Sequence, residues 1–416
     1  MNLKRVVVTG LGALTPIGNN IDEYWKGLSH GVSGAAPITR FNAEHFRTQF
    51  ACEVKGYDPL NHFDRKEARK MDPFAQFALI SSDEAIADSG LNLEKIDLDR
   101  AGVIWGSGIG GLKNFQDEVT GFATGNGTPR FNPFFIPKMI GDIAAGWISM
   151  KYSFRGPNFV TTSACASATN ALIDSFNYIR LGMADIILSG GSEHAITEAG
   201  IGGFNAMKAL SERNDSPETA SRPFDKDRDG FVLGEGAGAI ILEEYEHAKA
   251  RGAKIYAEVI GGGMSADAYH LTAPHPEGIG ITTVMKNALK DANIDPTEID
   301  YINVHGTSTP LGDAGETKAI ERVFGDHAYE LNISSTKSMT GHLLGAAGAI
   351  EGIACLLAMQ HDMVPPTINH FTDDENINSR LKLTFNQAVS RPVNVSLSNT
   401  FGFGGHNTSI IFRKVA

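Results

Sequence analysis

Short apolar runs alternate with segments of helical periodicity along the whole chain, and this alternation limits the fold to the α/β class. The apolar runs of strand length cover residues 5–9, 101–105, 185–189, 239–243, 256–260, 301–304 and 408–412. The chain has 416 residues, which is more than a single hydrophobic core usually serves. We therefore expect two fused or duplicated units.

A polar helix with basic residues is predicted over residues 243–252, EEYEHAKARG, and it separates the chain into two halves. We predict an N-terminal half over residues 1–252 and a C-terminal half over residues 253–416. Each half contains a helical segment that begins with small residues and continues with large apolar ones, after Cys165 and after His342. This similarity suggests an internal duplication with the two helices packed at the centre.

Cys165 lies where a strand-like segment ends and an amphipathic helix begins, in TTSACASATNALIDSF. Large apolar residues recur at helical spacing over residues 172–179, and Gly182 follows as the expected stop. Free backbone amides and the positive end of the helix dipole would favour a thiolate at Cys165 and could bind an oxyanion. A small, buried, unreactive cysteine is equally compatible with this segment alone.

Two histidines also lie at the ends of predicted elements, where scaffolds present catalytic groups. His305 follows the run 301–304 in YINVHGTSTPLGD, and His342 follows Lys337 in KSMTGHLLGAAG. Gly and small hydroxyl residues surround both, as expected where a ligand approaches the backbone. Taken alone, each histidine could be structural, and Lys337 could be a solvated loop residue.

Four motifs occur in order: SACASA around Cys165, VHGTSTPLGD around His305, KSMTGHLLGAAG around His342, and SNTFGFGGHN near the C-terminus. Together they resemble the β-ketoacyl-[acyl-carrier-protein] synthase family. The similarity extends from VVVTGLGALTPIG at residues 6–18 to FGFGGHNTSIIF at residues 401–412. The chain length and the loop GSGIGG are most similar to the elongating type II enzymes of bacterial fatty acid synthesis.

This resemblance implies a duplicated, five-layered α-β-α-β-α thiolase fold and a homodimer. It also implies a decarboxylating Claisen condensation. An acyl-carrier thioester would acylate the cysteine, and a malonyl-carrier thioester would then give a β-ketoacyl thioester, carbon dioxide and free carrier. No cofactor and no metal are expected. Thiolases proper use a second catalytic cysteine, whereas this chain supplies two histidines, and the inactive chain-length factors lack the nucleophile that this chain keeps.

The resemblance also assigns roles to residues. The implied catalytic set is Cys165, His305, His342 and Lys337. Glu351 is the expected charge partner of Lys337. The backbone amides of Cys165 and Phe403 would form the oxyanion hole, with Phe403 gating the acyl chain.

Further positions concern substrate binding. Thr307 and Thr309 match residues that hydrogen-bond the phosphopantetheine arm, although as turn residues they would need no such role. Ile109, Phe135 and Phe204 match the acyl pocket. Ordinary core packing is the alternative for these three, and a pocket built from core residues can satisfy both.

The net charge of −12 disfavours an acidic partner at long range, so an acyl carrier protein would need a local basic patch. Residues 64–72, DRKEARKMD, concentrate basic side chains. The expected carrier-docking residues are Lys66, Arg69, Lys70 and, from a second segment, Lys208. A solvated helix face is the alternative. This patch is too small for nucleic-acid binding to be expected.

Three cysteines in the whole chain argue against a disulfide framework and for a reducing compartment. Cys52 and Cys355 are expected to be inert. The apolar N-terminal run is interrupted by Gly and Pro, so a buried strand is expected rather than a signal peptide. No transmembrane helix is expected, and the protein is predicted to be cytoplasmic. The alternatives in function are a polyketide or specialised-lipid ketosynthase and a noncatalytic partner similar to a chain-length factor.

Overall fold

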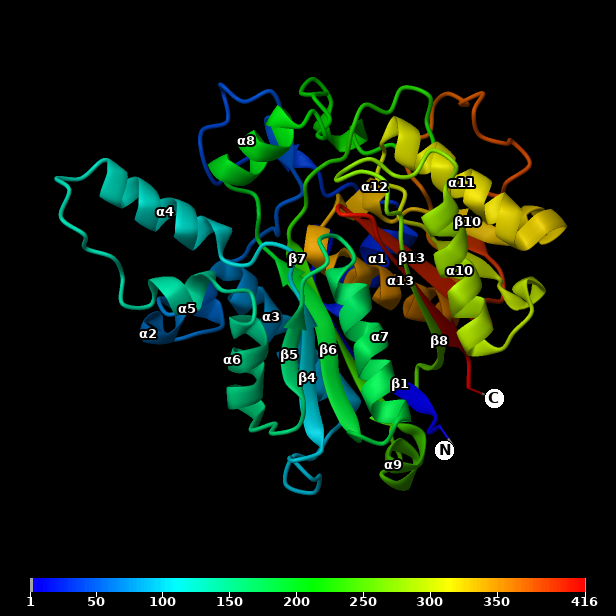
Figure 1. Cartoon of the computed structure of the whole chain (residues 1–416), viewed down its shortest axis with the longest axis horizontal. Helices are drawn as coiled ribbons and strands as arrows, with labels where there is room; N and C mark the ends of the chain where they lie inside the picture. The colour runs from blue at the N-terminus through cyan, green and yellow to red at the C-terminus, as the bar shows by residue number, and fades with distance from the viewer. Residues whose placement is uncertain (1–2, 416) are drawn as a thin grey trace.

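The computed structural model describes residues 3–415, which form a ten-stranded mixed sheet with helices in three layers (Figure 1). The strands are β1 (Val6–Leu14), β4 (Ala101–Gly106), β5 (Asn158–Thr161), β6 (Ile186–Glu193), β7 (Gly236–Glu244), β8 (Ala257–Ala266), β9 (Tyr301–Asn303), β10 (Asn332–Ser334), β13 (Val395–Gly402) and β14 (His406–Arg413). Two small pairs lie outside this sheet: β2 (Ala36–Pro37) with β3 (Phe50–Ala51), and β11 (Met363–Val364) with β12 (Val389–Ser390).

The helices connect and cover these strands. They are α1 (Ile21–Ser29), α2 (Arg65–Ala68), α3 (Pro73–Ser89), α4 (Leu112–Ala123), α5 (Phe135–Met139), α6 (Ile143–Tyr152), α7 (Ser167–Arg180), α8 (Glu198–Ala206), α9 (Tyr245–Ala250), α10 (Ile279–Ala292), α11 (Pro310–Phe324), α12 (Lys337–Thr340) and α13 (Ala347–His361).

The sheet repeats one strand arrangement twice. Outward from its middle, one half runs β1-β7-β6-β4-β5 and the other runs β8-β14-β13-β9-β10. In both halves the first two pairings are antiparallel and the last two are parallel. β1 and β8 join the halves through three residue pairs, from Val6 with Val259 to Val8 with Ala257. The expected duplication is therefore present in the topology, whereas the boundary between residues 252 and 253 stays a prediction.

Helices α7 and α13 form the central layer. α7 packs on β4 and β6 of the first half and also contacts β14, while α13 packs on β13 and also contacts β7. α3 and α6 cover the outer face of the first half, and α10 with α11 covers that of the second. These contacts give the five layers α-β-α-β-α of the thiolase fold.

The composition of α13 fits this central position. All of its residues from Ala347 to Met359 are buried, because strands and helices surround it. In the described part of the chain, the helical stretch Leu344–His361 is long and apolar enough to cross a membrane, but 89% of it is buried inside the protein. It is the core helix of a globular fold.

Candidate active site

Cys165 lies on a tight turn between β5 and α7. Ala164 adopts a left-handed backbone conformation with φ of 51°, which is strained for a residue with a side chain. The Ser167 hydroxyl accepts a hydrogen bond from Ser163 N (2.9 Å) and donates one to Ala164 O (2.6 Å), which holds the turn. A side chain at Gly402 would lie 3.1 Å from Cys165 N, so only glycine allows the end of β13 this close.

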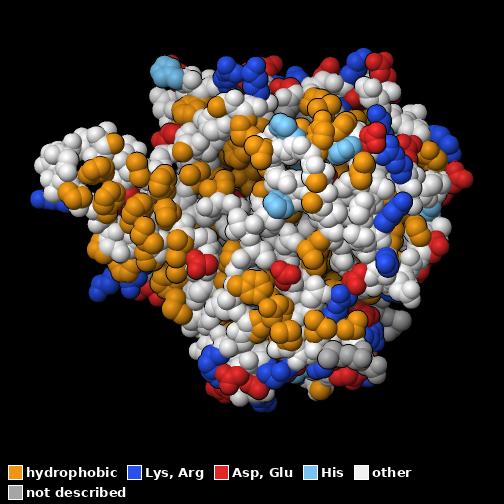
Figure 2. All heavy atoms as spheres, viewed as in Figure 1, with side chains coloured by type: hydrophobic (Ala, Val, Ile, Leu, Met, Phe, Trp, Pro, Cys, Tyr) orange, Lys and Arg blue, Asp and Glu red, His pale blue; other side chains and the backbone are white. Residues whose placement is uncertain are grey.

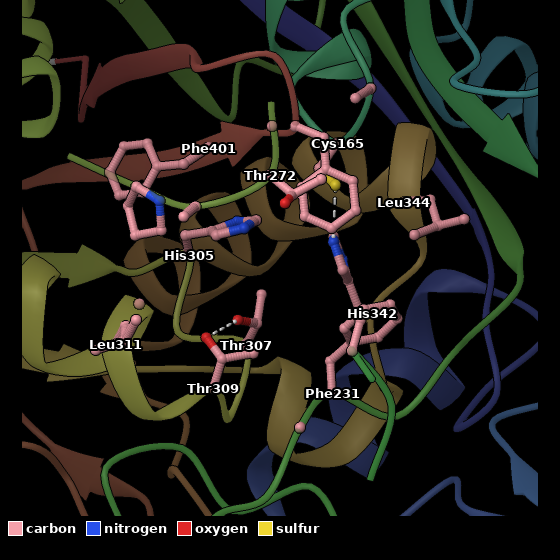
Figure 3. A pocket seen from close by; sticks show the side chains of 18 of the residues that line it. Cys165, Phe231, Thr272, His305, Thr307, Thr309, Leu311, His342, Leu344 and Phe401 are labelled. Carbon is pink, nitrogen blue, oxygen red and sulfur yellow. Dashed lines mark hydrogen bonds between the residues drawn. The ribbon is translucent and has the colours of Figure 1, made fainter. Parts of the chain in front are cut away.

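His342 contacts the sulfur of Cys165 directly. Its Nε2 atom lies 3.0 Å from Cys165 Sγ, and its ring packs edge-on against Phe231 at 5.4 Å (Figure 3). The His342 backbone N–H donates to Val232 O at 2.8 Å, which fixes this segment against the loop before β7. Residues from the two halves of the chain thus bring a thiol and an imidazole into contact, the arrangement that an activated nucleophile requires.

His305 faces the same space from the end of β9. Its ring centroid lies 5.3 Å from that of His342, with the two planes nearly perpendicular at 87°. Glu316 fixes the His305 loop, because its carboxylate accepts hydrogen bonds from His305 N (3.0 Å) and Gly306 N (2.9 Å). Within residues 3–415, the Nδ1 atoms of His305 and His342 have no hydrogen-bond partner.

The electrostatics of the site keep its three reactive groups neutral. Burial, and then the charge of Lys337, holds the pKa values of His305 and His342 well below the usual range of histidine. Burial raises the pKa of the Cys165 thiol to about 12, although Lys337 and a hydrogen bond from Phe403 N oppose this rise. The expected preference for a resting thiolate is therefore wrong, because desolvation outweighs the groups that favour charge.

Lys337 is a buried cation and does not belong to a solvated loop. Its side chain is 1% exposed and forms an ion pair and hydrogen bond with Glu351, which is equally buried on α13. Burial raises the pKa of Glu351 to about 7, while Lys337 acts in the opposite direction. The pair places a positive charge near enough to the two imidazoles to lower the pKa values of both.

A cavity of about 670 Å³ connects this cluster to the surface. Its lining includes the expected site residues Cys165, His305, His342, Thr307, Thr309, Phe403, Ile109, Phe204 and Lys208. The Oγ1 atoms of Thr307 and Thr309 lie 3.1 Å apart on one wall (Figure 3). Apolar side chains such as Ile109, Phe204 and Leu344 are prominent in the cavity lining, which suits the binding of an alkyl chain.

Some of the predicted residues lie elsewhere in the single chain. Phe135 is on α5 and stacks on Phe131 at 5.4 Å, outside the cavity lining. The segment with Lys66, Arg69 and Lys70 lies at α2, far from α8 in Figure 1, whereas exposed Lys208 follows α8 at the cavity mouth. The expected docking residues therefore form two separate groups on one chain.

Two buried carboxylates at the site were not predicted. Glu316 and Glu193 each accept hydrogen bonds from backbone amides of loops that line the cavity. A carboxylate at the end of a strand that begins with an apolar run, as in IILSGGSE, was the available signal for Glu193. Glu316 gave no such signal, because its helix has an ordinary polar pattern.

Comparisons with known proteins agree on one family. The chain matches the profile of the β-ketoacyl synthase N-terminal domain over residues 3–248 and that of the C-terminal domain over residues 256–371. It is 50% identical to the 3-oxoacyl-[acyl-carrier-protein] synthase 2 of Synechocystis sp. over 99% of this chain and 98% of that protein. It is 49% identical to the protein of the same name from Coxiella burnetii, with both chains fully covered.

Solved structures show the same similarity. A β-ketoacyl synthase from Burkholderia phymatum matches with a TM-score of 0.91 and 35% identity over 99% of this chain and all of that one. A ketosynthase from a type II polyketide synthase, in complex with its acyl-carrier protein and bound to the hexaketide, matches equally well, with both chains fully covered.

Proposed function

Because this chain belongs to the β-ketoacyl synthase family, we propose that it condenses an acyl-carrier thioester with a malonyl-carrier thioester in fatty acid elongation. The observation that carries the proposal is the 3.0 Å contact between Cys165 Sγ and His342 Nε2, in a cavity that also holds His305. Relatives at 46–50% identity are named for 3-oxoacyl, that is β-ketoacyl, chemistry, whereas the polyketide ketosynthase is 35% identical. Fatty acid elongation is therefore favoured over a polyketide pathway.

In the first half-reaction, the thiol of Cys165 attacks the acyl thioester and its proton passes to His342 Nε2. A carbon–sulfur bond forms to Cys165, and the carbonyl oxygen becomes an oxyanion next to the amides of Cys165 and Phe403. When this intermediate collapses, the bond to the carrier sulfur breaks. The leaving thiolate takes the proton from His342, so the acyl-enzyme forms without net proton change.

In the second half-reaction, the malonyl thioester loses carbon dioxide, and the electron pair of the broken bond becomes an enolate. Neutral His305 can donate one hydrogen bond to the thioester oxygen, and His342 can donate a second once its proton has moved from Nδ1 to Nε2 between the two half-reactions. The lowered pKa values of both histidines keep them neutral. The enolate carbon then attacks the acyl carbonyl, and the bond to Cys165 breaks with the electron pair on sulfur. The Cys165 thiolate takes up one proton from solvent, which restores the thiol and is the net proton uptake of the decarboxylation. The buried Lys337–Glu351 pair supports the neutral imidazoles.

We also propose a homodimer as the active assembly. Hydrophobic side chains gather on the exposed hairpin of α4 and α5, as Figure 2 shows, among them Phe115, Phe122 and Phe134. β5 lies at the edge of the ten-stranded sheet, where a second copy could extend the sheet. Phe135 lies on this hairpin, so its expected part in the acyl pocket requires a second copy.

The cytoplasm is the proposed compartment. The three cysteines are buried and unpaired, as expected in a reducing environment.

The proposed partner is an acyl carrier protein in its acyl- and malonyl-loaded forms, and the two basic groups are its proposed docking residues.

The proposal is tested by intact mass after incubation with acyl-carrier thioesters from butyryl to hexadecanoyl, without a malonyl donor. We expect one acyl group per chain, attached at Cys165, and the series ranks the accepted chain lengths. Addition of malonyl-carrier thioester should then release the β-ketoacyl product. A folded protein that takes no acyl group from any of these donors would overturn the proposal.

Reversing the charge of the α2 segment should weaken carrier docking. In the variant Lys66→Glu with Lys70→Glu, we expect KM for acyl-carrier substrates to rise roughly tenfold, since the local field attracts an acidic partner. The kcat value should change by less than about twofold, because the cavity is untouched. The matched control is Lys95→Glu with Lys290→Glu, two exposed positions outside both basic groups with the same change in charge. An equal rise in KM in both variants would show that the α2 segment is not a docking site for the carrier protein.

A further inference from the structure

Glu193 is a buried carboxylate that no step of the proposed reaction uses. It ends β6, has an exposure of 0%, and is surrounded by backbone donors. Its Oε2 atom accepts from Gly108 N (2.8 Å) and Gly345 N (3.0 Å), while Oε1 accepts from Ile109 N (3.2 Å) and Gly110 N (3.3 Å). Burial raises the pKa of Glu193, and these four N–H groups oppose the rise.

The four donors belong to two loops that both line the cavity. The loop after β4 contributes Ile109, and the loop after His342 contributes Leu344, which Figure 3 shows beside the Cys165–His342 pair. Leu344 has a left-handed backbone with φ of 47°, so its conformation depends on outside support. Glu193 is thus the link between the two loops.

The loops are in direct contact at their glycines. A side chain at Gly345 would lie 2.2 Å from Gly108 N and 2.6 Å from Glu193 Oε2. A side chain at Gly108 would lie 2.8 Å from Glu193 Oε2 and 3.3 Å from Ala164 O, next to the nucleophile. The two loops and the Glu193 carboxylate are therefore packed against one another with no room for an added side chain, so the position of each loop depends on the carboxylate that they share.

We propose that Glu193 is a positioning residue whose carboxylate ties the Ile109 loop to the Leu344 loop and thereby sets the length of acyl chain that can acylate Cys165. This inference rests on the proposed function. A carboxylate is needed because it only accepts hydrogen bonds, whereas a glutamine amide would oppose two N–H donors with its own N–H groups. One loop would then lose its anchor, so Ile109 or Leu344 would no longer be held in place on the cavity wall. A long acyl chain runs past more of this wall than a short one, so its acylation should be affected more.

The test is the variant Glu193→Gln, measured by the rate of Cys165 acylation with the shortest and the longest acyl-carrier thioesters, from butyryl to hexadecanoyl, that the unaltered protein accepts. We expect the ratio of the long-chain rate to the short-chain rate to fall roughly tenfold, the effect of about one lost charge-assisted hydrogen bond. The short-chain rate should stay within about threefold. The control is Glu235→Gln, because Glu235 is equally buried but contacts Arg40 and Val54 N, which lie outside the cavity lining.

An unchanged ratio in folded Glu193→Gln, or the same fall in Glu235→Gln, would overturn the inference. If Glu193→Gln does not fold, Ser107→Ala decides, since the Ser107 hydroxyl donates to Glu193 Oε1 (3.3 Å) and accepts from Gly110 N (3.2 Å). Its ratio should fall in the same direction, and an unchanged ratio would reject the proposal. Absence of acylation in the unaltered protein would instead reject the proposed function.

Discussion

Replacing Cys165 with alanine should abolish condensation and leave the fold intact. The sulfur is the nucleophile in the proposed reaction, so turnover should fall on the order of 10⁴-fold or more. The change removes one buried atom, so unfolding should become easier by only about 1 kcal/mol. Release of β-ketoacyl product from acyl- and malonyl-carrier thioesters measures the effect, and thermal unfolding checks the fold.

Two further measurements make this prediction specific. Carbon dioxide should still be released from malonyl-carrier thioester alone, because His305 and His342 remain in place. Cys355→Ala should condense at the normal rate, since Cys355 is an equally buried thiol in the middle of α13. Condensation that persists in Cys165→Ala would contradict the mechanism.

Breaking the Lys337–Glu351 pair should produce the largest loss of stability. Lys337→Met leaves the carboxylate buried without a partner, and Glu351→Gln does the same to the ammonium group. Each single variant should lose about 3 kcal/mol of unfolding free energy, because an uncompensated buried charge is far less stable than the pair. The double variant Lys337→Met with Glu351→Gln should recover most of this loss. Denaturant unfolding of the four proteins measures the coupling.

The same variants have a second readout in their dependence on pH. The charge of Lys337 lowers the pKa values of His305 and His342, so its removal raises both values. A larger fraction of imidazolium then forms at acidic pH, and imidazolium disturbs the neutral donors of the second half-reaction. The acidic limb of the rate profile should therefore shift to higher pH in the double variant. If the losses of unfolding free energy in the two single variants add in the double variant, and the acidic limb of the rate profile does not shift, the pair neither stabilises the fold nor adjusts the histidine pKa values.

The strands that the sequence revealed are those with strongly apolar composition. All seven expected runs fall on strands of the sheet, from β1 to β14. β13 was missed because it contains Ser, Asn and Thr, which are buried yet hydrogen-bonded in the sheet, and β10 was missed because it has only three residues. Pattern reasoning detects hydrophobic contrast, and these strands have little of it.

The site could be predicted only in part for a related reason. Motif similarity identified Cys165 and the two histidines as one set, although 140 and 177 positions separate them. Glu193 and Glu316 were missed because their partners are backbone N–H groups, which every residue except proline carries. The place of Phe135 in the acyl pocket could not be checked in a single chain, because the hairpin of α4 and α5 that carries it projects away from the rest of the protein.

The repeated sheet has a consequence for cooperativity. Its two halves share α7 and α13 as a common core, and the β1–β8 ladder joins them through three residue pairs. Neither half can expose its inner face without exposing that of the other, so the two halves form one cooperative unit rather than two independent modules. Because the cysteine comes from one half of the chain and the histidines from the other, the complete site exists only when both halves are folded together. An ancestral single copy would have needed a second molecule to build one.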